Sequence, residues 1–262
     1  MRQSLCCAIC LVALAATASG QLPTPPPLDH FKCYFIPDQT VLPQEALTLQ
    51  DQFDIPNQVW ENIRDLRRVR LCNPVAKIHR NSVTPITNPK AHLVLFRIDP
   101  QPIVPRDVVV RNQFGLQALA VRDAQVLAVP TAKTLANEDP PTEIPAGLDH
   151  FKCYSATGKR VKDGVTLRDQ FHTETVRVLD PIAFCNPTRK IHNTVATGVQ
   201  NAQAHLTCYT ITVSPFGGAS VNVLNQFGGA QFRVLRADVL CVPSQKLKWS
   251  ESNPDTSGDE AP

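Results

Sequence analysis

Histidine is the residue type in this chain whose spacing could do chemistry. The chain has seven histidines, and six of them occupy matched positions in its two halves. Imidazole is a common ligand of zinc and copper, so three histidines in each half could form a metal site that Asp51 or Asp169 completes. Two copies of a structural residue would give the same pattern, so the assignment stays open. The candidate metal ligands are His30, His79, His92, His150, His192 and His205.

A Gln-Phe pair recurs four times, each time directly after Asp or Asn. The pairs are Gln52-Phe53, Gln113-Phe114, Gln170-Phe171 and Gln226-Phe227. A Phe at the end of a strand is most simply a core anchor, and the Asp or Asn before it can bond its own backbone to begin a turn. The alternative is a ligand groove lined by these polar groups, which nothing in the local sequence requires.

The sequence carries no catalytic motif with defined spacing. It has no G-x-S-x-G, no H-E-x-x-H and no Gly-rich phosphate loop. Carboxylate pairs of glycosidases have no short motif, but the chain has only 2 Trp and 3 Tyr to line a sugar cleft. A net charge of +3, with arginines at 64–70 interspersed with Glu61 and Asp65, does not favour nucleic-acid binding. We therefore predict no catalytic residue, no cofactor and no nucleic-acid partner.

An internal repeat carries all of these residues. Leu28 to Tyr34, read as Leu-Asp-His-Phe-Lys-Cys-Tyr, returns letter for letter as Leu148 to Tyr154. Weaker copies begin at Ala91 and Ala204. The chain thus contains four modules, which we number 1 to 4 and place at residues 28–90, 91–133, 148–203 and 204–246.

The cysteines follow the repeat. In module 2 both cysteine positions are replaced together, by Leu95 and Ala128. A disulfide loses its purpose when either partner is lost, and Leu with Ala can fill an apolar site instead. The paired replacement predicts three disulfides, each worth about 3 to 4 kcal/mol by the chain-entropy argument. The predicted pairs are Cys33–Cys72, Cys153–Cys185 and Cys208–Cys241.

The elements that carry these residues are predicted to be strands. Short alternating, β-branched runs, such as residues 165–168 and 175–178, are separated by Pro, Gly, Asn and Asp. This pattern predicts an all-β chain of two tandem antiparallel sandwich or barrel domains, each of about eight strands built from two four-stranded modules. We place domain 1 at 28–133, a linker at 134–147, domain 2 at 148–246 and a disordered tail at 247–262.

The amino terminus has the pattern of a secretory signal peptide. A basic start is followed by the apolar run Leu5 to Ala18, and residues 1–20 are expected to be removed. This run is shorter than the roughly 20 apolar residues of a membrane span, so we expect no span in the mature chain. Six cysteines in an exported chain are typical of disulfides. We expect the protein to be secreted, periplasmic or at the cell surface.

The repeated motifs also resemble a family of bacterial exported repeat modules of unknown function. The resemblance rests on the duplicated Leu-Asp-His-Phe-Lys-Cys-Tyr, the Asp-Gln-Phe and Asn-Gln-Phe-Gly strands, and the closing Leu240 to Pro243. It implies no activity and no site residues. We therefore expect an extracellular binding or structural module rather than an enzyme, with an unknown ligand, protein or glycan as its partner. The alternative is an extracellular hydrolase that uses a His/Asp metal site or a carboxylate pair.

Overall fold

The computed structural model describes residues 28–38 and 40–252. Within these ranges the chain forms a 16-stranded antiparallel sheet and one 3-10 turn, which confirms the all-β prediction. The predicted signal peptide lies outside the described residues. In chain order the elements are β1 (His30–Phe35), β2 (Val41–Gln50), η1 (Ile55–Asn57), β3 (Glu61–His79), β4 (Ser82–Thr84), β5 (His92–Gln101), β6 (Arg106–Asn112), β7 (Gly115–Leu135), β8 (Phe151–Gly158), β9 (Asp163–Arg168), β10 (Thr173–Pro187), β11 (Arg189–His192), β12 (Val195–Thr197), β13 (His205–Ile211), β14 (Ala219–Asn225), β15 (Gly228–Val234) and β16 (Ala237–Glu251).

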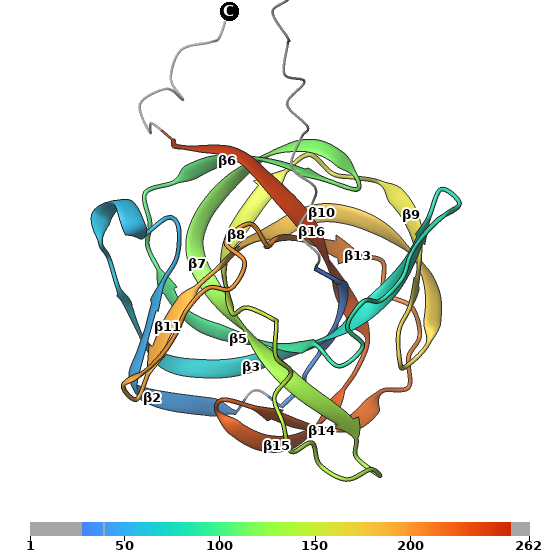
Figure 1. Ribbon diagram of the computed structural model, residues 1–262. Coiled ribbons are helices and arrows are strands. Elements are labelled where there is room, and N and C mark those ends of the chain that lie inside the picture. The colour runs from blue at the N-terminus through green and yellow to red at the C-terminus, as the bar shows by residue number, and fades with distance from the viewer. Residues whose placement is uncertain (1–27, 39, 253–262) are drawn as a thin grey trace, which may run out of the picture.

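Eight of the strands close into a ring, which we call the central ring (Figure 1). Its strand order is β3-β1-β16-β13-β10-β8-β7-β5, and β5 pairs back to β3. Each module supplies two of these strands, so the modules follow one another around the ring as 1, 4, 3, 2. The strands of both predicted domains therefore share one barrel-like sheet instead of forming two separate ones. The boundaries at 133 and 148 stay predictions about the repeat.

The interior of the central ring is filled by one face of its strands. Strand residues alternate between the two faces, so Phe31 and Cys33 point inward while Lys32 and Tyr34 point outward. The three predicted disulfides are confirmed and belong to this inner core, each joining directly opposite residues on neighbouring strands with Cα–Cα distances of 3.9, 4.0 and 3.9 Å. In module 2, Leu95 lies opposite Ala128 in the same register.

A second layer surrounds the central ring. Each module has an outer strand, which lies outside the ring. This outer strand pairs with a strand from the carboxyl-terminal part of the module two places along the chain. The pairs are β2 with β11, β9 with β3, β6 with β16, and β14 with β7. Modules 1 and 3 are therefore interlocked, and so are modules 2 and 4. The larger apolar core lies between the outer strands and the central ring.

Two predicted boundaries need correction. β16 continues to Glu251, so residues 247–251 form strand rather than disordered tail, because they pair with β6. Residues 253–262 of that predicted tail lie outside the described range. The first two residues of the predicted linker, Thr134 and Leu135, belong to β7, and residues 136–150 form no strand.

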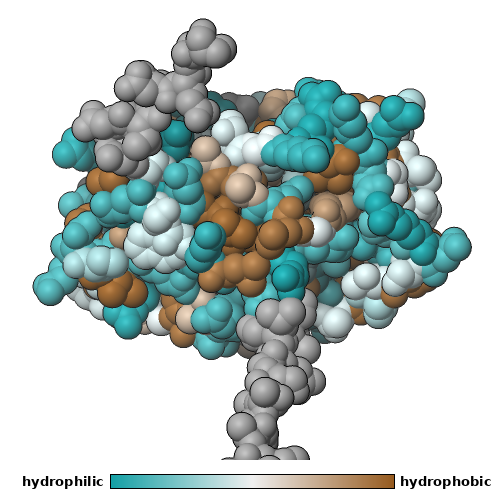
Figure 2. Space-filling view, turned by 90° about the horizontal axis from the view of Figure 1, so that it is seen from above, coloured by the Kyte–Doolittle hydropathy of each residue, from teal (hydrophilic) through white to brown (hydrophobic). Residues whose placement is uncertain are grey.

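The surface is mixed in polarity. Figure 2 shows apolar side chains gathered in the middle of the side of the molecule that bears β6 in Figure 1. On β6, β7 and β8 a shallow pocket of about 340 Å³ is lined by Val109, Ala118 and Ala120 among others. In the part of the chain that the structure describes, no helix is long and apolar enough to cross a membrane.

Candidate functional site

The Asp or Asn before each Gln-Phe pair begins a turn, as predicted. Its side-chain oxygen accepts a hydrogen bond from the backbone N–H of the Phe two residues on, at 2.8 Å for Asp51, 2.9 Å for Asn112, 3.0 Å for Asp169 and 2.9 Å for Asn225. Each Phe then packs on an aromatic residue of the module two places along. The ring pairs are Phe53–Tyr154, Phe171–Tyr34, Phe114–Tyr209 and Phe227–Phe96. The core-anchor interpretation is confirmed.

Two buried ion clusters connect modules 1 and 3. Lys152 Nζ lies 2.6 Å from Asp54 and 2.8 Å from Glu61, and its side chain is 0% exposed. In the reciprocal position Lys32 Nζ lies 3.3 Å from Asp169 and 3.1 Å from Glu174, also at 0% exposure.

Tyrosine hydroxyls complete both clusters. Tyr154 donates to Asp51 at 2.8 Å, and Tyr34 donates to Asp169 at 2.9 Å. Burial raises the pKa of Asp51, and it raises the pKa of Glu61 to about 7 although Lys152 opposes the shift. The charged groups of these clusters are paired with one another inside the protein.

Sequence reasoning missed these clusters, although a signal for them exists. Modules 1 and 3 carry Lys in the opening motif and Asp before Gln-Phe, whereas modules 2 and 4 carry Val94 or Thr207 and Asn112 or Asn225. Lysine and aspartate are thus lost together. A buried charge needs a partner, so this joint loss could have predicted an ion pair between the two motifs.

Four further clusters occur where neighbouring modules meet, and we call them seams. Each seam combines a His and a Lys from one module with the Gln of the Gln-Phe pair of the next module. The seams are His30, Lys77 and Gln113; His92, Lys133 and Gln170; His150, Lys190 and Gln226; and His205, Lys246 and Gln52. In three seams the lysine Nζ donates a hydrogen bond to the Gln Oε1; these lysines are Lys133, Lys190 and Lys246. In two seams the histidine Nε2 contacts the Gln Oε1, at 2.5 Å for His30 and at 2.8 Å for His150.

Burial controls the charge of the seams. It lowers the pKa of each seam lysine, at positions 77, 133, 190 and 246, to about 8. It also lowers the pKa of His30 and His150 to about 4, that of His205 to about 3, and that of His92 well below its usual value. The four seam histidines are therefore neutral at pH 7.

The structure separates the histidines that the sequence proposed as metal ligands. His30, His92, His150 and His205 belong to four different seams, while His79 Nε2 lies 3.1 Å from Asp163 and His192 lies beside Asn193. Among the described residues, no group of three or more His, Cys, Asp and Glu side chains could hold a metal ion.

The unmatched His172 adjoins one buried ion cluster. Its Nε2 lies 3.2 Å from Glu174, its Nδ1 lies 3.4 Å from the Tyr34 hydroxyl, and its ring stacks on Phe216. Ser214 donates its hydroxyl hydrogen to Glu174 rather than to the imidazole. A serine nucleophile needs a base to take its proton, and here the histidine does not fill that place.

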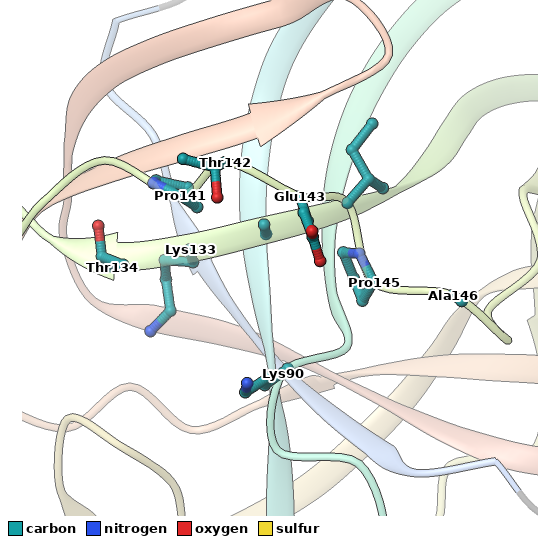
Figure 3. Close-up of a pocket in the computed structure, with 10 residues that line it drawn as sticks. Lys90, Lys133, Thr134, Pro141, Thr142, Glu143, Pro145 and Ala146 are labelled. Atoms are coloured by element: carbon teal, nitrogen blue, oxygen red, sulfur yellow. The ribbon is translucent and has the colours of Figure 1, made fainter.

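A pocket of about 430 Å³ lies where the linker crosses the end of β7 (Figure 3). Lys133 and Thr134 of β7 form one wall, Lys90 lies below them, and residues 141–146 of the linker form the other wall. Lys133 belongs to the seam between modules 2 and 3, so this seam opens to solvent through the pocket. Glu143 is the acidic residue in its lining.

Comparison with known proteins agrees with the duplication. No curated protein and no solved structure matched the chain. Two overlapping stretches, residues 7–130 and 103–243, match the family described as Repeat of unknown function. The three disulfides suggest an extracellular or otherwise oxidising environment. Because the two matches together cover most of its length, the chain belongs to the family Repeat of unknown function (DUF7450).

Proposed function

We propose that this chain is an exported bacterial repeat protein that acts outside the cell as a binding or structural module. The observation that carries the proposal is where the chemically capable side chains lie. The two buried lysines, their carboxylate partners and the seam residues all join one module to another. Because these side chains join modules to one another, they support a rigid scaffold whose partner, a protein or a glycan, contacts the outer surface.

A hydrolase is the competing class, and its best candidates are the carboxyl groups around Lys152. The raised pKa of Glu61 would suit a general acid. However, Asp51, Asp54 and Glu61 are only 2%, 5% and 8% exposed. A substrate must reach the catalytic groups, so their burial favours the structural role.

The two classes separate in one experiment on the oxidised, purified protein. We compare the wild type with Glu61→Gln in thermal unfolding and in turnover of ester, peptide and glycoside substrates. For a binding or structural module, the substitution changes the melting temperature and neither protein shows turnover. Turnover by the wild type that Glu61→Gln abolishes, with an unchanged melting temperature, would establish the hydrolase instead.

A further inference from the structure

Two of the four seams place a lysine amine, a glutamine amide and an aspartate together. The trios are Lys246, Gln52 and Asp51, and Lys133, Gln170 and Asp169. In each, the aspartate lies close enough to the amine to oppose the fall in the lysine pKa. We call these the acidic seams. The other two seams have Asn112 and Asn225 in the aspartate position, and we call them the neutral seams.

The amines of the acidic seams lie against aromatic rings. Lys246 Nζ is 4.9 Å from the centre of the Phe53 ring, and Lys133 Nζ is 4.3 Å from that of Phe171. With a pKa of about 8, roughly one tenth of each amine is uncharged at pH 7. An uncharged lysine amine is a nucleophile.

The glutamines of the acidic seams are held in one orientation. Gln52 Nε2 donates to the carbonyl of Ala202 at 2.5 Å, and Gln170 Nε2 donates to that of Pro89 at 3.3 Å. Each Oε1 accepts a hydrogen bond from its lysine Nζ. The amine therefore lies beside the amide group whose Cδ carries that oxygen. Both seams border a pocket, of about 430 Å³ beside Lys133 and about 340 Å³ beside Gln52, into which a small product could leave.

We propose that Lys246 with Gln52, and Lys133 with Gln170, become joined by isopeptide bonds. The uncharged Nζ attacks the glutamine Cδ, a new C–N bond forms, and the Cδ–Nε2 bond breaks. The neighbouring aspartate takes the proton that Nζ loses and gives it to Nε2, which leaves as ammonia. The sum is an amine and a primary amide giving a secondary amide and ammonia, without any oxidant or co-reactant.

The positions of these bonds complement the disulfides. All three disulfides join residues within one module. Modules 1 and 2 meet modules 3 and 4 at two places in the central ring, and these are the two acidic seams. The isopeptide bonds would therefore join the two halves of the chain at both contacts and make the ring covalently closed.

The mass of the folded, oxidised protein tests the proposal. After full reduction and denaturation, we expect the protein to be lighter than its sequence by two molecules of ammonia, and tryptic digestion to release Lys246 linked to Gln52 and Lys133 linked to Gln170. Cleavage at a protease site inserted after Thr142 should leave both halves joined on a reducing, denaturing gel. An unchanged mass with separable halves would overturn the proposal.

The neutral seams supply a matched control. Asp51→Asn with Asp169→Asn copies the residues at Asn112 and Asn225, which begin the same turn. This variant should regain both ammonia masses, and retention of the crosslinks would contradict the role given to the aspartates. So would a crosslink between Lys190 and Gln226 in the wild type. Should the double variant fail to fold, Lys246→Arg keeps the charge and should restore one ammonia mass.

Discussion

At the scale of single residues, the two fully buried lysines of the described chain, Lys32 and Lys152, each lie against two carboxylates. Lys32 of module 1 pairs with Asp169 and Glu174 of module 3. In modules 2 and 4 the corresponding residues are uncharged, and they are Thr207, Asn112 and Gln117. The register places Glu174 and Gln117 in equivalent positions, opposite Leu167 and Val110. The chain thus fills the same three equivalent positions with a charged set of side chains in modules 1 and 3 and with an uncharged set in modules 2 and 4.

The two solutions should be exchangeable as complete sets. Lys32→Thr alone leaves two buried carboxylates without their cation and should lower the free energy of unfolding by about 3 to 5 kcal/mol. Adding Asp169→Asn and Glu174→Gln should recover most of the loss. Urea unfolding measures both values, with the exposed Lys159→Thr as a control that stays within about 0.5 kcal/mol. A triple variant as unstable as the single one would contradict this account.

The buried histidine and carboxyl groups predict opposite responses to acid. Burial lowers the pKa of His150 from 6.5 to about 4, so between these pH values the unfolded chain binds more protons and the free energy of unfolding falls as pH falls. Burial raises the pKa of Glu61 from 4.5 to about 7, so it favours the folded chain in acid. Between pH 7 and pH 4.5, His150→Gln should therefore lose less stability than the wild type, and Glu61→Gln should lose more. Parallel pH profiles of urea unfolding would disprove both assignments.

At the scale of elements, one long strand in each of modules 1 and 2 serves both layers. β3 has 19 residues and β7 has 21, and each passes from an outer hairpin into the central ring and out to an interlocking partner. Directly opposite positions on neighbouring ring strands hold the disulfides. In module 2 the equivalent, directly opposite positions hold Leu95 and Ala128, so this module has no disulfide there.

A fourth disulfide should therefore form without rearrangement. Leu95→Cys with Ala128→Cys places two thiols in the register of Cys208 and Cys241, whose Cα atoms are 3.9 Å apart. Closing this loop should raise the free energy of unfolding by up to about 4 kcal/mol. Thiol titration and urea unfolding of oxidised and reduced protein measure the effect, and the two single variants report the cost of the lost apolar volume. Two free thiols in the folded double variant would show that the register does not bring them together.

At the scale of the whole molecule, the four modules share one closed ring of strands. Modules 1 and 2 contribute β3, β1, β7 and β5 to the central ring, and modules 3 and 4 contribute the other four strands. Either half alone would expose two unpaired strand edges and half of the inner core. The interlocked outer strands would also lose their partners.

We therefore expect residues 28–140 and residues 141–252 to fold together and not alone. Each fragment expressed by itself should give poorly dispersed NMR spectra and rapid proteolysis. Co-expression of the two should give a complex with the circular dichroism spectrum and size of the intact chain. A well-dispersed spectrum from either fragment alone would instead support two self-contained domains.

The sequence by itself determined the β class, the four modules, the three disulfide pairs and the turns at Asp51 and its equivalents. These are local or repeated features: alternation indicates a strand, an Asx side chain reaches its own backbone, and the joint replacement of two cysteines by Leu95 and Ala128 indicates a cross-strand disulfide in the other modules. Only the tertiary structure decided how the modules close on one another. The ring order 1, 4, 3, 2 and the interlocking of modules two places apart depend on strand pairs far apart in the chain, such as β1 with β16, where Phe31 lies opposite Cys241. No local pattern encodes such pairing. The joint loss of lysine and aspartate in modules 2 and 4 signals the buried ion pairs, but the Lys-Gln seams became visible only when distant modules were brought together.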